Sequence, residues 1–224
     1  MIRRLAQSAP IGFKPLFQAA VLSVAALLLG TAAPSAAQDL PSEAAAAPDD
    51  NETSSHNPAH DPQFILANLD EVSPFNLIFV VADEWKKGNK LRAAFWYYIW
   101  QIRTDAWVTG VDREEFKLVR AMMSDETGQV IYNWIAADPA LMRDTVERAI
   151  GYEATLPLSK QRPEELNEAD WLAIVSKSRT DYAAELREAF ANTADEDILA
   201  RRRQNGLPIG TPQDIGAPLD AHWR

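Results

Sequence analysis

The sequence predicts an all-α protein: a single irregular bundle of about six or seven helices around an aromatic-rich central helix, with no significant sheet. Three observations support this fold class. The run from Leu91 to Trp107 is apolar on two opposite sides of a helix. Ser73-Pro74 and Asp138-Pro139 are typical helix starts. No segment offers a convincing run of β-branched residues in alternation.

Residues 1–37 are predicted to be a cleavable export signal. A basic start precedes an apolar run from Leu16 to Gly30, and small residues then lead to a cleavage site before Gln38. The apolar run is shorter than the ~20 residues that span a bilayer, which favours a cleaved signal over a retained anchor. We therefore expect a periplasmic protein with no stable membrane insertion after cleavage. General secretion fits the residues around Arg3-Arg4 better than twin-arginine export.

Composition divides the exported part into three segments. Residues 38–63 are rich in small and polar residues and are predicted to be a disordered linker, because they offer little apolar surface to bury. Residues 64–206 form the predicted α-helical domain, which is long enough to build a core without disulfides or metal. Residues 207–224 hold three prolines and two glycines and are predicted to be an irregular C-terminal tail.

The charge of the chain limits its partners. The 22 basic and 32 acidic residues, less the three basic residues of the signal, leave a net charge near −13. Such a surface repels nucleic acid and anionic lipid, and it suits a soluble protein or one with a basic partner. The chain has no cysteine, which excludes disulfides, thiol catalysis and cysteine metal sites.

The first predicted helix starts at Ser73-Pro74, stops at Gly88 and leads through a three-residue turn, Lys87 to Asn89, into the central helix. So short a turn makes the two helices antiparallel neighbours. One stripe of the central helix consists of Leu91, Phe95, Tyr98 and Ile102. The opposite stripe consists of Trp96, Trp100, Arg103 and Trp107. A helix with two such stripes is predicted to pack on both sides.

The later helices follow from capping and breaking signals. Asp112 and Glu115 form a capping box, Asp138 caps the helix that begins at Pro139, and Gly206 ends the last helix. The predicted later helices run from Asp112 to Met123, Val130 to Ala137, Pro139 to Ile150, Glu164 to Phe190 and Ala194 to Gln204.

The hairpin residues resemble a known repeat. The pattern Ala82-x-x-Trp85-x-x-Gly88, followed by Ala93 and Tyr97, resembles one helix hairpin of the Sel1 or tetratricopeptide type. In that family small residues permit close helix approach, the glycine makes the turn and the aromatics fill the groove. A second copy is not found at the family's spacing, so the resemblance covers about 25 residues.

A second resemblance is to a broad set of uncharacterised exported bacterial proteins. It is carried by the tryptophan–glycine turn, by an FWYY-like helix, here Phe95 to Tyr98, and by a basic helix with an NGL-like tail, here Arg201 to Leu207. This resemblance implies an α-helical fold and no site.

No recognisable catalytic motif is found. The chain has no nucleophile elbow, no phosphate-binding loop and no histidine in the predicted core to serve as a base. His56 and His60 are spaced like zinc ligands, but the linker composition favours a solvated segment. We therefore predict no enzyme activity, no cofactor and no metal. Glu84, Asp83 and Asp105 are the carboxylates on which a lysozyme-like hydrolase would have to rely.

The candidate partner-binding site is the second aromatic stripe with its arginines: Arg92, Trp96, Trp100, Arg103 and Trp107. Such residues would stack on a partner's aromatics or on sugar rings and hold a carboxylate. The same stripe would be core if neighbouring helices covered it, because each aromatic side chain buries about 150–250 Å². The arginines within it favour a position at an edge.

We therefore expect a non-enzymatic periplasmic α-helical protein that binds another macromolecule through the aromatic helical-hairpin face. The expected partner is an unknown periplasmic or envelope protein, not nucleic acid. Two alternatives stay open: a cell-wall glycan hydrolase or glycan-binding module, and an immunity or inhibitor-type protein that neutralises a basic partner. The sequence leaves the oligomeric state undetermined.

Overall fold

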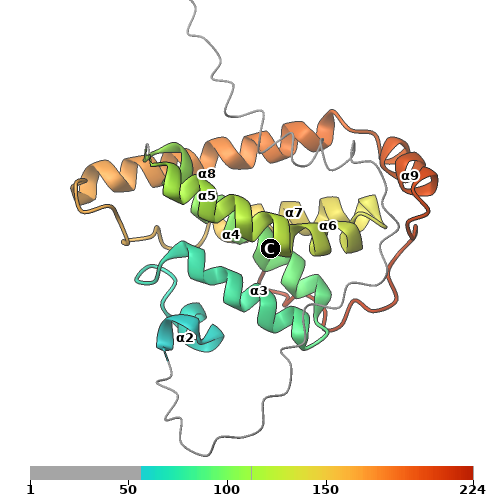
Figure 1. Cartoon of the computed structure of the whole chain (residues 1–224), viewed down its shortest axis with the longest axis horizontal. Coiled ribbons are helices and arrows are strands. Elements are labelled where there is room, and N and C mark those ends of the chain that lie inside the picture. The colour runs from blue at the N-terminus through green and yellow to red at the C-terminus, as the bar shows by residue number, and fades with distance from the viewer. Residues whose placement is uncertain (1–56, 112, 224) are drawn as a thin grey trace, which may run out of the picture. The chain divides into compact units, whose positions relative to one another are not determined.

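Helix α4 (Lys90–Thr109) lies at the centre of the fold, and α3, α5, α6, α7 and α8 all pack against it. The computed structural model describes residues 57–111 and 113–223. Within this part, α8 runs along one side of α4 and α3 along the other (Figure 1). The predicted signal, residues 1–37, and the predicted linker as far as residue 56 lie outside the described residues.

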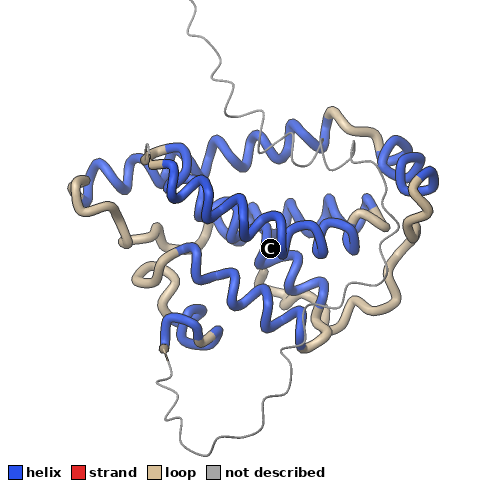
Figure 2. Tube along the Cα trace, viewed as in Figure 1, coloured by secondary structure: helices blue, strands red, loops and turns tan. Residues whose placement is uncertain are grey.

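The described residues contain helices and loops but no strand (Figure 2). Their α-helices are α2 (Pro62–Ala67), α3 (Leu77–Lys86), α4, α5 (Glu114–Met123), α6 (Gln129–Ile135), α7 (Pro139–Glu153), α8 (Glu168–Ala191) and α9 (Asp195–Gln204). The 3-10 helices are η1 (Pro58–His60) and η2 (Pro74–Asn76), and a π-helical segment, η3 (Ser124–Gly128), joins α5 to α6. Seven of the α-helices have seven or more residues, so the predicted all-α bundle is confirmed.

Local signals explain several of the helix boundaries. Gly88, with a φ of 77°, ends α3, and the turn to α4 is closed by a 2.9 Å hydrogen bond from the Asn89 side-chain amide to Glu84 Oε2. The Asp138 carboxylate caps α7 by accepting from the amide of Leu141 at 3.1 Å, as predicted. The Ser73 side chain makes no capping hydrogen bond, and Pro74 begins η2 instead of α3.

The described fold includes residues that precede the predicted domain boundary at residue 64. Helix α2 starts at Pro62, and the Asp61 carboxylate caps it by accepting from the amide of Gln63 at 2.9 Å. Ile65 of this short helix is fully buried in the main core. The last residues of the predicted linker are therefore part of the fold.

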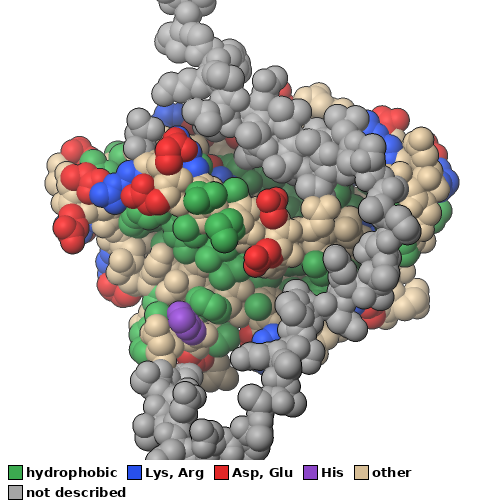
Figure 3. Space-filling model, in the orientation of Figure 1, with side chains coloured by type: hydrophobic (Ala, Val, Ile, Leu, Met, Phe, Trp, Pro, Cys, Tyr) green, Lys and Arg blue, Asp and Glu red, His purple; other side chains and the backbone are tan. Residues whose placement is uncertain are grey.

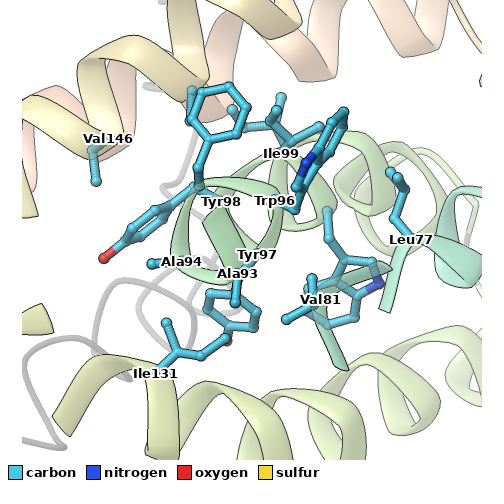
Figure 4. Close-up of a cluster of buried hydrophobic side chains, with 14 of the residues drawn as sticks. Leu77, Val81, Ala93, Ala94, Trp96, Tyr97, Tyr98, Ile99, Ile131 and Val146 are labelled. Atoms are coloured by element: carbon cyan, nitrogen blue, oxygen red, sulfur yellow. The ribbon is translucent and has the colours of Figure 1, made fainter. Parts of the chain in front are cut away.

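The core surrounds α4, as its two apolar stripes predict. Figure 4 shows its side chains spreading around the helix toward Leu77 of α3, Ile131 of α6 and Val146 of α7. Both stripes are covered by neighbouring helices. A smaller cluster around Trp107 and Trp171 continues the core along α4.

The C-terminal tail has no helix or strand, as predicted, yet it packs on the core. Trp223 is buried and stacks on Phe95 with ring centroids 4.8 Å apart. Gly216 passes against the α3–α4 turn so closely that an added Cβ would lie 2.2 Å from the carbonyl oxygen of Gly88. This close approach, with a φ of 72°, requires glycine.

Candidate functional site

The tryptophans predicted to form a partner-binding face lie in the core. Trp96, Trp100 and Trp107 are 2%, 0% and 9% exposed. Trp96 contacts the rings of Tyr152 and Trp223, which reach it from α7 and from the tail. The predicted site on this stripe is therefore wrong, because the rest of the chain covers both sides of α4.

Arg103 lies inside the protein, not at an edge. Its guanidinium donates to Glu153 at 3.2 Å and to the carbonyl oxygens of Leu69 and Pro157 at 2.8 and 3.0 Å. Glu153 also forms an ion pair with Arg179 at 2.8 Å. Burial raises the pKa of Glu153 above its usual value, although both arginines oppose this shift.

A cavity of about 10 Å³ lies beside this cluster. Ser159 Oγ lies at its wall and has no hydrogen-bond partner in the described chain. The cavity has room for about one water molecule, so it is too small for an organic ligand.

Arg92 is half-buried and holds the tail instead of facing a partner. It donates to Asp220 at 2.6 Å and to the carbonyl oxygen of Pro218 at 2.9 Å. Its guanidinium also lies over the ring of Trp223, 5.3 Å from the ring centre. None of the five predicted site residues therefore forms an open binding surface.

The carboxylates considered for glycan hydrolysis are not brought together. Glu84 contacts Asn89 beside the start of α4, whereas Asp105 lies about 22 Å further along that helix at 1.5 Å per residue. Asp105 is also buried and paired with Arg120 at 3.3 Å. Asp83, the neighbour of Glu84, is paired with Lys87. Glu84 and Asp105 therefore do not flank one cleft as a hydrolase pair would.

No group of three or more acidic or histidine residues in the described part of the chain could hold a metal ion. His60 stacks on Phe79 with ring centroids 4.3 Å apart. His56, its possible co-ligand, lies outside the described residues.

Three exposed large apolar side chains lie on α5, and two of them, Leu118 and Met122, are the most exposed of this kind in the described part of the chain. Leu118, Val119 and Met122 are 63%, 39% and 56% exposed. Figure 3 shows hydrophobic side chains gathered over this helix, with acidic side chains beside them. We call these three residues the α5 face. Their spacing places them on one side of the helix, so they form a continuous apolar stripe.

The opposite side of α5 carries a buried arginine. Arg120 pairs with Asp105 and donates to the carbonyl oxygen of Gln101 at 3.1 Å, and its guanidinium lies 5.2 Å from the ring centre of Tyr182. Asp105 also accepts from Ser178 Oγ at 2.8 Å. Helix α5 thus presents an ion-paired arginine together with Phe116 and Met123 to the core, and a second apolar stripe to solvent, unlike an ordinary surface helix.

The π-helical segment η3 continues α5 beneath this face. Gly128 lies so close to Tyr97 that a Cβ would be 2.1 Å from the tyrosine hydroxyl, which accepts a hydrogen bond from Gln101 at 3.0 Å. Asp125 and Glu126 of η3 are exposed. Such π-helical insertions are frequent at functional sites, so the end of α5 is a candidate binding region.

Glu185 of α8 lies near Arg120. Partial burial and the nearby carboxylates of Asp105 and Asp181 raise its pKa to about 7. Its Oε2 atom is buried and makes no hydrogen bond within the described chain. Arg120 opposes this shift, and it is paired with Asp105.

Sequence reasoning named Phe116, Val119 and Met123 as helix residues but missed the α5 face. The signal was present: Phe116 and Met123 form one apolar stripe, whereas Leu118 and Met122 form another. The structure covers only the first of them.

Comparisons with known proteins give no information on function. No protein-family model, no curated protein and no solved structure matches the chain. The resemblances to the Sel1 or tetratricopeptide hairpin and to exported bacterial proteins stay predictions. In the described ranges, no helix is both long and apolar enough to cross a membrane.

Proposed function

We propose that this is a non-enzymatic periplasmic binding protein that docks another protein on the α5 face. The exposure of Leu118 and Met122 on an amphipathic helix carries this proposal. Large apolar side chains clustered on a surface and bordered by polar residues are typical of interaction sites. The periplasmic location rests on the predicted signal.

Two features of α5 support binding over a purely structural role. Its side facing the core is already held by the Arg120–Asp105 pair, so the exposed stripe is not needed to attach the helix. Exposed apolar side chains do not stabilise the core. Their contact with water is unfavourable, and a partner that covers them removes this cost. The α5 face thus replaces the aromatic stripe of α4 as the proposed partner-binding surface.

The test uses the exported protein. The full chain is expressed with its own signal and purified from the periplasmic fraction, where mass spectrometry checks for a new start at Gln38. Crosslinked capture from envelope extract is then compared for the wild type and the Leu118→Ser/Met122→Ser double variant. A matched control, Leu207→Ser/Ile209→Ser, changes the other exposed aliphatic pair.

We expect a specific protein that the wild type and the control capture and that the α5 variant loses. Circular dichroism must first show that all three baits have the same helix content. If the α5 variant captures the same proteins in the same amounts as the wild type, the proposal is wrong.

A further inference from the structure

We propose that the α5 face binds a basic amphipathic helix of the partner, with lysine or arginine side chains of that helix reaching Asp125 and Glu126. This inference rests on the proposed function. It adds the chemistry of the partner, which comes from the charges around the α5 face.

The shape of the apolar stripe favours a helix. Leu118 and Met122 are one helical turn apart, and Val119 widens the stripe on the same side. A second helix can lie along such a stripe with its own apolar residues at positions i, i+3, i+4 and i+7. An extended strand would find no unpaired sheet edge here, because the described residues contain no strand.

The carboxylates at the two ends of α5 differ in what they can offer. At the start of the helix, Glu114 pairs with Lys117 at 2.6 Å and Glu115 pairs with Arg113 at 3.6 Å. At the other end, Asp125 and Glu126 are exposed, and among the described residues they form no ion pair. Cations from a partner would therefore be drawn to the η3 end.

The same charges argue against other occupants. A second copy would bring carboxylates against carboxylates, and the chain carries a formal net charge of −10. Anionic lipid would meet the same repulsion. A basic partner is attracted by the whole surface, which also increases its association rate.

The test uses three peptides of about 18 residues, five turns of helix. The probe has leucines on one side and lysines on the other, a scrambled peptide keeps its composition, and a third replaces each lysine with glutamate. Binding to the purified protein is measured by calorimetry at two salt concentrations. We expect the probe to bind at least about tenfold more tightly than either control peptide, a difference of about 1.4 kcal/mol.

Variants locate the binding. We expect Leu118→Ser/Met122→Ser and Asp125→Asn/Glu126→Gln each to weaken probe binding about tenfold, since each removes one half of the proposed contact. The Leu207→Ser/Ile209→Ser control should bind as the wild type does. Equal binding of probe and scrambled peptide, or of wild type and α5 variant, would overturn the inference, because it would show unspecific charge attraction.

Failure of this inference is distinct from failure of the proposed function. If envelope extract yields a protein that needs the α5 face but the probe does not bind, the function stands and the basic partner is wrong. Sedimentation that shows a dimer lost in the α5 variant, or binding to anionic vesicles that needs this face, would also overturn it.

Discussion

Helices α4 and α5 have the same pattern of two apolar stripes, but the stripes of α4 are buried to a much greater extent. Each carries two apolar stripes, and each places an arginine among its buried residues. On α4 both stripes are covered, by helices from α3 to α8 and by the tail. On α5 only the side of Phe116 and Met123 is covered, and the α5 face is left in solvent. An apolar stripe therefore predicts burial or binding, and the number of neighbours decides between them.

The two arginines extend this comparison. Arg103 of α4 and Arg120 of α5 are both buried and both paired with a carboxylate from another helix. For α4 this pair adds to a large apolar contact. For α5 the pair is a principal attachment, since few of its apolar side chains face the core. The following changes test that difference, from the largest expected effect to the smallest.

Replacement of Trp100 by alanine should be the most damaging change. The side chain is completely buried, so we expect a loss of about 3–5 kcal/mol in the free energy of unfolding. Leu118→Ala on the exposed side of α5 should cost less than about 0.5 kcal/mol. Urea unfolding followed by circular dichroism measures both. Similar losses for the two variants would mean that the α5 face is covered in solution.

The next change removes the attachment of α5. Arg120→Met leaves the buried Asp105 carboxylate without its ion-pair partner, which should cost about 3 kcal/mol. Arg113→Met removes an exposed arginine of the same region and should cost less than about 1 kcal/mol. Hydrogen exchange should show α5 opening before α4 in the first variant. Unchanged exchange in α5 would show that the apolar contacts alone hold this helix.

A smaller effect is expected where η3 passes over α4. Gly128→Ala brings a Cβ against the Tyr97 hydroxyl, and the overpacking should cost about 2 kcal/mol. Adding Tyr97→Phe removes the nearest atom and should restore part of the loss. Thermal unfolding of the two single variants and the double variant gives the coupling. Simple additivity would show that the two residues do not meet.

The smallest expected effect depends on pH. The pKa of Glu185 is raised to about 7 in the folded protein, so its charged form destabilises the fold above that pH, and this cost disappears as pH falls toward the usual value for glutamate. Glu185→Gln should therefore stabilise the protein by about 1 kcal/mol at pH 8, after allowance for solvent screening, and by almost nothing near pH 4.5. Chemical denaturation of both proteins at the two pH values measures the difference. A gain that is equal at both would exclude titration of this carboxylate as the cause.

Local signals in the sequence were enough for the fold class and for much of its detail. The proline and aspartate caps, the Gly88 turn and the two stripes of the central helix are short-range features that side-chain chemistry determines. The early start of the domain at Pro62 was missed because it depends on one buried residue, Ile65, packing on a distant core.

The candidate site was less predictable, for a physical reason. Periodicity shows which residues share a side of a helix, but not which other elements reach that side. The charge of Arg103 predicted a position at the edge of the fold, but its ion pair with Glu153 of another helix allows it to be buried. Trp96 likewise is covered by Trp223 from the tail. In both cases a residue distant in the sequence determines the burial of the side chain.

The tail also affects how fast the protein folds. Its Trp223 must find Phe95, and its Asp220 must find Arg92, across a separation of 128 residues. Contacts this distant in sequence form slowly, because closing a long loop costs chain entropy before the contact contributes any stabilising energy. We expect the core to be completed late, in a slow refolding phase that the difference in tryptophan fluorescence between the wild type and Trp223→Phe would report. For a chain with a predicted general-secretion signal, such a delay would keep it unfolded while it is exported.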